Sequence, residues 1–107
     1  MTEYIQVFTT VESRQSADAI AESMVEKRLV ACVQITGPIT STYRWEGQIE
    51  TANEWLMIIK TRKDLYMDLE RNIKEIHSYD IPEILAVPVV EGNSDYLDWV
   101  AEETGSQ

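Results

Sequence analysis

Hydrophobic positions recur along this chain with two spacings, and these spacings predict its elements. Short apolar, β-branched runs predict four strands at 4–10, 31–45, 49–61 and 83–90. Apolar residues three and four positions apart predict amphipathic helices at 14–28, 63–77 and 93–104. Gly37-Pro38 interrupts the second strand as a bulge or bend would, and Gly47 suits a tight hairpin turn. We expect the helix N-caps at Glu12 or Ser13 and at Asn93 or Ser94.

The order of these elements is β-α-β-β-α-β followed by a terminal helix. This is the split-βαβ pattern of a ferredoxin-like α+β sandwich, here with a long β-hairpin and a C-terminal helix. A chain of 107 residues suits one domain, and the sequence shows no linker, repeat or low-complexity segment. We therefore expect one domain over residues 1–107.

Two of the predicted strands are apolar on both faces. The runs are "WLMIIK" at 55–60 and "ILAVPVV" at 84–90, and two helices can cover only one face of their sheet. A bare apolar face would be a large exposed patch, so we expect another chain to cover it. The third strand would also run roughly 45 Å, at ~3.3 Å per residue. Its hairpin should project beyond the core and offer open edges to a partner. Both features favour an oligomer built through the sheet.

Charge and cysteine content narrow the classes of function. The formal net charge is −10, which argues against nucleic acid because binding to it needs a concentrated cationic face. One cysteine excludes an intrachain disulfide and gives no sign of an oxidising compartment. The N-terminus lacks the features of a signal peptide, and no apolar run approaches the ~20 residues that span a bilayer. We expect a cytoplasmic protein with no membrane partner.

Candidate chemistry gathers in "HSYDIPEI", residues 77–84, which holds the chain's only histidine. His77 is either a copper ligand or a helix-end residue whose ring bonds the last carbonyls. Tyr79, Asp80 and Glu83 add oxygen atoms beside it. Cys32 would be a soft metal ligand as a thiolate, but a strand cysteine usually packs as a small hydrophobe. A thiol–imidazole pair of Cys32 and His77, oriented by Asp80, is the enzymatic alternative. No nucleophile elbow or phosphate-binding loop accompanies it, so we expect no enzyme.

Other polar and aromatic residues allow both a structural and a ligand-binding interpretation. Lys60 is the only charge within "WLMIIKT", and an ion pair with Glu83 would satisfy it if their strands are neighbours. That pair would either fix strand register or line a pocket between subunits. Large amphipathic side chains are common both in interfaces and in ligand pockets. We expect interface packing for them; they are Tyr43, Trp45, Tyr96 and Trp99.

Five segments follow one another along the chain: "LVACVQI", "STYRWEGQIE", "IKT", "HSYDIPEI" and "VPVVEGNSDYLDWV". In this order they resemble the CutA family, the divalent-cation tolerance proteins, and the resemblance runs from Val7 to Trp99. It implies a ferredoxin-like, tightly trimeric cytoplasmic protein associated with copper binding and tolerance, with no established enzymatic activity. It also implies an architecture similar to the PII signalling trimers.

The chain departs from the family's pattern at its metal-binding positions. The family usually has His-Pro-Tyr-Glu, whereas Ser78 and Asp80 replace the proline and the glutamate here. A first-strand cysteine and a histidine pair bind copper in some members, and their positions are Thr9 and Ile76-His77. That site is therefore not intact.

The resemblance and the residues together give two candidate sites. We expect Cu(II), and other divalent cations more weakly, to bind without an organic cofactor at a metal site drawn from His77, Cys32, Asp80 and Glu83. The alternative is a PII-like small-ligand sensor, with Lys60, Arg44 and Arg62 as anion contacts. Its subunit cleft would be lined by Tyr43, Trp45, Lys60, Tyr79, Glu83 and Trp99.

Overall fold

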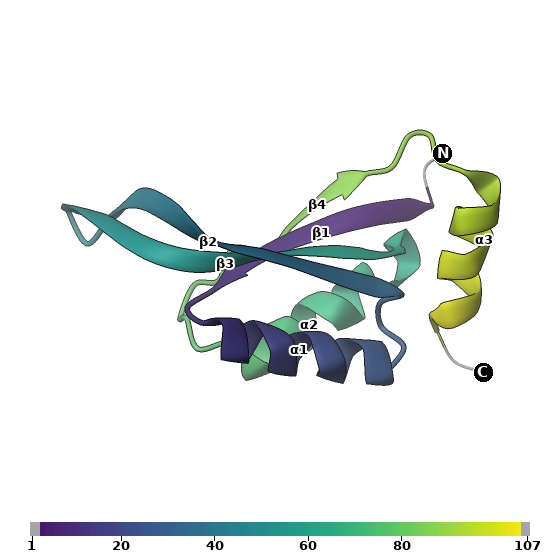
Figure 1. The fold of residues 1–107 in the computed structure, drawn as a ribbon, viewed down its shortest axis with the longest axis horizontal. Coiled ribbons are helices and arrows are strands. Elements are labelled where there is room, and N and C mark those ends of the chain that lie inside the picture. The colour runs from purple at the N-terminus through teal and green to yellow at the C-terminus, as the bar shows by residue number, and fades with distance from the viewer. Residues whose placement is uncertain (1–2, 106–107) are drawn as a thin grey trace.

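The computed structural model describes residues 3–105 and contains the predicted order of elements. The four strands form one antiparallel sheet in the order β2-β3-β1-β4 (Figure 1). The expected α+β architecture is confirmed. The elements are β1 (Tyr4–Val11), α1 (Arg14–Glu26), β2 (Cys32–Trp45), β3 (Gln48–Arg62), the 3-10 turn η1 (Lys63–Leu65), α2 (Tyr66–Ile76), β4 (Leu85–Pro88) and α3 (Ser94–Glu103).

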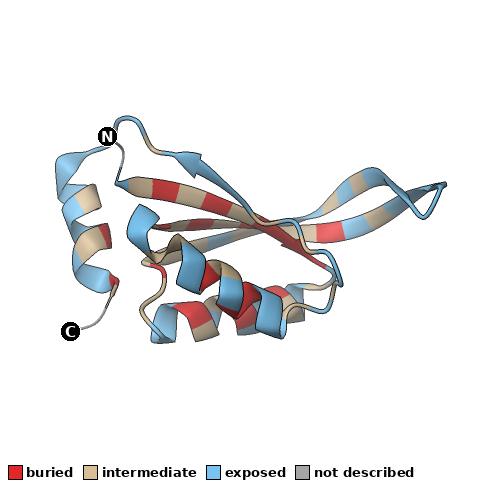
Figure 2. Ribbon diagram, turned by 180° about the vertical axis from the view of Figure 1, so that it is seen from behind, coloured by how far each residue is buried: buried red, intermediate tan, exposed pale blue. Residues whose placement is uncertain are grey.

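The helices α1 and α2 lie side by side on one face of the sheet, and the core lies between them and the strands (Figure 2). Alternate residues of β1 and β3 point toward these helices, as the period of two in a strand requires. Val7 pairs with Ile59 in the ladder, and both are fully buried. The helices add the fully buried side chains Met24, Leu69 and Ile73.

The opposite face of the sheet carries apolar side chains that neither α1 nor α2 covers. Phe8 pairs there with Ile58 on one side and with Leu85 on the other. Leu85 is 60% exposed and Val87 is also exposed. α3 lies at one end of the sheet, away from the hairpin (Figure 1). The expectation that the helices cover only one of two apolar faces is therefore confirmed.

The hairpin of β2 and β3 projects well beyond the core, as its length predicted (Figure 1). The molecule measures 45 × 26 × 22 Å along its principal axes. The ladder between the two strands shifts register between Thr36 and Ile39, which is the predicted irregularity at Gly37-Pro38. Gly37 lies against the Trp55 ring, where an added Cβ would come within 2.7 Å of a ring carbon.

The first helix is shorter than predicted. It ends at Glu26 because Arg28, which fitted the apolar spacing, adopts a left-handed φ of 60°. The Arg28 guanidinium instead donates to the carbonyls of Glu102, at 2.6 Å, and Gly105, at 3.2 Å. It thereby satisfies the Glu102 carbonyl in the last turn of α3, which the helix leaves without a partner, and ties down Gly105 just beyond the helix.

The other element boundaries differ in smaller ways. Residues 63–65 form the 3-10 turn before α2, and β4 covers 85–88 rather than 83–90 because its ladder with β1 ends at Pro88, beyond which one further backbone bond joins the Val89 N–H to the Tyr4 carbonyl at 3.0 Å. Pro88 ends this edge strand, as expected for a proline that cannot donate to a ladder. The N-caps are Ser13, which accepts from the Ser16 N–H, and Asn93.

Candidate functional site

His77 directly follows α2 and uses both nitrogen atoms of its ring. The backbone N–H of Tyr79 donates to Nδ1 at 3.1 Å, so Nδ1 carries no proton. Nε2 therefore holds the proton and donates it to the Thr10 carbonyl at 2.8 Å. The ring links the end of α2 to β1 and fixes the path of the loop. A metal ion could bind Nδ1 only by displacing the Tyr79 N–H.

Glu12 ties the same loop to the start of α1. Its Oε2 accepts from the hydroxyls of Ser16, at 3.2 Å, and Ser78, at 3.0 Å. Desolvation acts to raise the pKa of Glu12, but its backbone hydrogen bond and the two serine hydroxyls outweigh that effect and lower the pKa. The carboxylate is thus stabilised in its charged form by the residues that hold the loop.

The loop places Tyr79 over a buried carboxylate. The Tyr79 hydroxyl donates to Glu54 Oε2 at 2.8 Å, and its ring lies 4.8 Å from the His77 ring, centroid to centroid. Glu54 is only 7% exposed. Burial, and then the hydrogen bond to Glu54 and its charge, raise the pKa of Tyr79 well above its usual range. Tyr79 is therefore a neutral hydrogen-bond donor at neutral pH.

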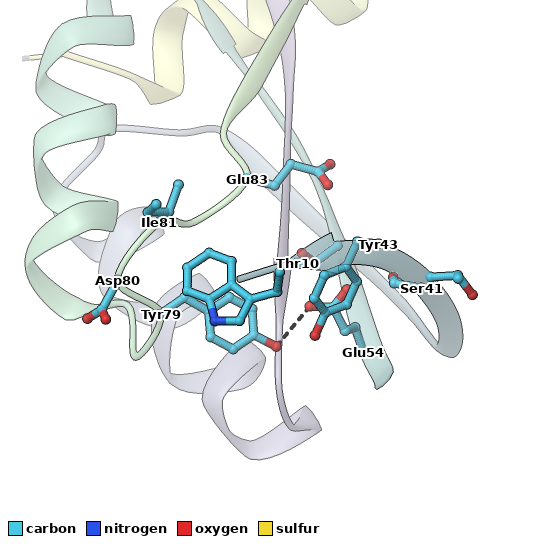
Figure 3. Close-up of a pocket in the computed structure, with 10 residues that line it drawn as sticks. Thr10, Ser41, Tyr43, Glu54, Tyr79, Asp80, Ile81 and Glu83 are labelled. Carbon is cyan, nitrogen blue, oxygen red and sulfur yellow. Dashed lines mark hydrogen bonds between the residues drawn. The ribbon is translucent and has the colours of Figure 1, made fainter. Parts of the chain in front are cut away.

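A cavity of about 550 Å³ opens between this loop and the base of the hairpin (Figure 3). The pairing of Ile39 with Glu54 puts alternate residues of β2 on the same side as the Glu54 carboxylate. These include Tyr43 and Trp45, which are both exposed. The lining residues are Thr10, Ser41, Thr42, Tyr43, Trp45, Glu54, Tyr79, Asp80, Ile81 and Glu83.

A second group of candidate residues lies at the other end of the sheet, near α3. Cys32 pairs with Lys60 where β2 begins, and Lys60 donates to Gln34 Oε1. The rings of Tyr96 and Trp99 lie 5.7 Å apart on α3. Burial, and then the Cys32 thiol, raise the pKa of Tyr96. Lys60 and Trp99 thus do not share the cavity with Tyr43, Trp45, Tyr79 and Glu83.

The predicted metal residues do not meet within one subunit. Among residues 3–105, no three histidine, cysteine, aspartate or glutamate side chains gather as a metal site would require. Cys32 lies beside Lys60, whereas His77 bonds to Thr10, which is paired with Leu56, four residues before Lys60 in β3. Asp80 and Glu83 follow His77 in the loop and line the cavity, whereas His77 is not among the lining residues.

The suggested ion pair of Lys60 with Glu83 is wrong for a single chain. β1 separates β3 from β4, so the condition that their strands are neighbours is not met. No ion pair of Lys60 occurs within the described part of the chain. Its ammonium group is satisfied by Gln34 instead.

Glu54 is the site residue that the sequence analysis missed. It immediately precedes "WLMIIK", and an acidic residue at the border of an apolar strand was a signal that could have singled it out. The decisive contact joins Glu54 to Tyr79, 25 positions away, through the loop after α2. A contact over this separation cannot be predicted from the local spacing of residues.

Comparison with known proteins agrees with this fold. A crystal structure of CutA1 from Oryza sativa superposes with a TM-score of 0.95 at 39% identity, covering 99% of this chain and 97% of that one. The structure of a divalent cation tolerance protein from Thermus thermophilus superposes with a TM-score of 0.93 at 43% identity, covering 95% and 99%. The architecture thus defines a small ferredoxin-like protein with a long hairpin.

Sequence comparison gives the family. The sequence model described as CutA1 divalent ion tolerance protein matches residues 5–103. The Thermus thermophilus divalent-cation tolerance protein CutA is 44% identical over 99 residues, which cover 92% of this chain and 96% of that protein. Human protein CutA is 43% identical over 92% of this chain, which spans only 55% of the human protein. This chain belongs to the CutA1 divalent ion tolerance family.

Membrane insertion through a helix finds no support in the described residues. None of their helices has both the length and the apolar composition needed to cross a bilayer.

Proposed function

We propose that this chain acts as a cytoplasmic homotrimer in divalent-cation tolerance and binds Cu(II). The observation that supports assembly is the apolar sheet face opposite α1 and α2, where Leu85 and Val87 are exposed. Removing such a face from water contributes about 25 cal/mol per Å² of apolar surface toward association, and the entropy cost of bringing the subunits together opposes it. The number of subunits, three, is taken from the trimeric architecture that the family resemblance implies.

The proposed copper ligand is His77 Nδ1, released from the Tyr79 N–H. Neutral imidazole is a good ligand for Cu(II), and Asp80 and Glu83 lie exposed in the same loop. Each subunit offers one imidazole, so further ligands come from these carboxylates or from a neighbouring subunit. Because binding must break the 3.1 Å bond from the Tyr79 N–H, we expect micromolar or weaker affinity.

Cytoplasmic location is proposed from the cysteine content. Cys32 is the only cysteine and stands free in the structure, so the fold does not depend on an oxidising compartment. The names of some relatives give other compartments: one from Arabidopsis thaliana is called chloroplastic, and one from Archaeoglobus fulgidus is called periplasmic. Fractionation of cells that express the chain tests this part of the proposal.

Calorimetric titration with Cu(II) tests the metal site. We expect His77→Gln to weaken binding by roughly tenfold or more, because an amide is a poor copper ligand. Gln keeps an N–H donor for the Thr10 carbonyl, so a loss of binding would not simply report a loosened loop. The control is Glu22→Gln, which removes a carboxylate from the exposed face of α1. Equal affinity in the parent and in His77→Gln would exclude His77 as the ligand.

A small-ligand sensor is the second candidate, and the cavity beside Tyr79 supports it. Its volume of about 550 Å³ falls within the range of small-molecule pockets, and aromatic rings contribute to its walls. The anion contacts first suggested for such a ligand do not reach it: Lys60, Arg44 and Arg62 are absent from the cavity lining within residues 3–105. A sensor built on this cavity would therefore bind a ligand that is not an anion.

A further inference from the structure

The cavity contains a buried carboxylate that no basic side chain within residues 3–105 of the same chain neutralises. Glu54 is 7% exposed, and no ion pair reaches it within residues 3–105. Its only side-chain hydrogen bond in that part of the chain comes from the neutral Tyr79 hydroxyl and uses Oε2. Burying a carboxylate without a cationic partner is costly. A cation in the cavity would offset this cost.

The aromatic rings and the other carboxylates around Glu54 also favour a bound cation. Tyr43, Trp45 and Tyr79 line the cavity, and aromatic faces attract ammonium and guanidinium groups. Asp80 and Glu83 add negative charge to the lining. Figure 3 shows Tyr79 reaching across to Glu54, with Glu83 above this pair and Asp80 to one side of it. No lysine or arginine of the described chain contributes to these walls.

We propose that this cavity binds a small organic cation, an ammonium or guanidinium group carried on an apolar body. Glu54 would accept its N–H groups through Oε1, and the aromatic rings with Ile81 would cover its apolar part. The neutral Tyr79 hydroxyl holds Oε2 and orients the carboxylate. The proposal concerns the small-ligand candidate and does not depend on copper binding.

The chemistry separates this ligand from the other species that a negative cavity attracts. A hard metal ion needs about six oxygen ligands at close distance, whereas Glu54 is the only buried carboxylate in this lining. Anions are disfavoured by three carboxylates and by the lack of basic residues in the described lining. A neutral ligand would leave the Glu54 charge uncompensated. An organic cation would both compensate the Glu54 charge and interact favourably with the aromatic rings.

Calorimetry with two matched probes tests the proposal on the assembled parent protein at 0.15 M salt. The probes are phenethylammonium chloride and 2-phenylethanol, which have the same ring and chain and differ in charge. We expect the ammonium to bind with roughly tenfold or greater preference over the alcohol, because the carboxylate pairs only with the cation. Equal binding of the two probes, or no binding of the ammonium, would overturn the proposal.

Variants then locate the binding. Glu54→Gln keeps the shape of the side chain and should weaken phenethylammonium binding by roughly tenfold or more. Glu26→Gln, which removes an exposed carboxylate from α1, should leave it unchanged and controls for net charge. Trp45→Ala changes an exposed ring and should also weaken binding, so it decides the case if Glu54→Gln does not fold. Equal loss in Glu26→Gln and Glu54→Gln would reduce the effect to surface charge and refute the site.

Two further measurements distinguish this proposal from the copper site and from a role of the cavity in the subunit interface. Phenethylammonium is titrated into the parent in metal-free buffer, and Cu(II) is titrated in buffer without the amine, so a failed copper site and a failed cation site are distinguishable. A structure of the assembled protein shows whether the cavity stays open. A lysine or arginine of a second copy inserted against Glu54, together with no probe binding, would assign the cavity to the subunit interface and overturn the ligand proposal.

Discussion

The imidazole of His77 joins the end of α2 to β1, with its Nε2 only 2.8 Å from the carbonyl oxygen of Thr10. The other ring nitrogen accepts the N–H of Tyr79. One side chain thus fixes both the end of a helix and the direction of the following loop. That direction carries the Tyr79 hydroxyl to the buried carboxylate of Glu54.

Replacing His77 with alanine should lower the free energy of unfolding by about 1–3 kcal/mol, because the buried Thr10 carbonyl and the Tyr79 N–H lose their partners. Urea denaturation at a fixed protein concentration measures the change. His77→Gln should lose less, since its amide still offers a donor. Lys74→Ala, an exposed change one turn earlier on α2, serves as the control. Equal losses in His77→Ala and Lys74→Ala would contradict this role.

Tyr79→Phe tests the bond to Glu54. It removes the donor from a buried carboxylate and should cost about 1–3 kcal/mol of stability. Tyr66→Phe is a matched control, because the Tyr66 hydroxyl donates to Glu70 at 3.2 Å and neither residue is fully buried. We expect the Tyr66 change to cost clearly less in the same urea titration. A cost at position 66 equal to that at position 79 would argue against a special environment at Glu54.

Alkaline titration should distinguish Tyr79 from the other tyrosines of the chain. Its pKa is raised in the folded protein, so the neutral form is stabilised by folding. The resulting stability is complete below the unfolded pKa of about 10 and is lost as the pH rises from there toward the folded pKa. Burial also raises the pKa of Tyr66 and Tyr96, but the shift is largest at Tyr79, so absorbance near 295 nm should show an early phase from the other tyrosines and Tyr79 ionising last. Tyr79→Phe should leave the early phase unchanged, and a smaller early phase in that variant would contradict the prediction.

The bare sheet face can be tested with two equally exposed residues. Leu85, 60% exposed on β4, lies on that face, whereas Met67, 66% exposed, lies on α2. Leu85→Lys should weaken assembly, since it places a charge in the surface that the proposed trimer would bury between its subunits. Met67→Lys should leave assembly intact. Size exclusion with light scattering decides between these outcomes, and a parent protein that is already monomeric at micromolar concentration would contradict the proposal.

The sequence predicted the elements well because each has a strong local signal. The stripes of α1 and α2, the Gly47 turn and the doubly apolar "WLMIIK" all depend on near neighbours in the chain. Arg28 was misread because its spacing fits a helix, and only its contact with α3 explains the early stop. The pairing of Glu54 with Tyr79 and the separation of Cys32 from His77 are tertiary facts. They follow from the order of strands in the sheet, which the local spacing of hydrophobic residues does not reveal.

Gly37 offers a last test, at the register shift in the hairpin ladder. An alanine Cβ at this position would lie 2.7 Å and 2.9 Å from ring carbons of Trp55 and 3.1 Å from the Glu54 carbonyl oxygen. The Trp55 ring packs against the core, so it cannot move aside freely. Gly37→Ala should therefore destabilise the protein by about 1–3 kcal/mol, the usual cost of overpacking.

Gly47→Ala is the matched control at the tip of the hairpin. Nothing lies within 4 Å of its added Cβ, so the only cost arises from the positive φ of 80°, about 1 kcal/mol. Urea denaturation should rank Gly37→Ala as the less stable variant. Tryptophan fluorescence should also shift in Gly37→Ala, because the Trp55 ring must move, and stay unchanged in Gly47→Ala. The reverse ranking would mean that turn strain at the tip, rather than the contact of Gly37 with Trp55, limits the stability of the hairpin.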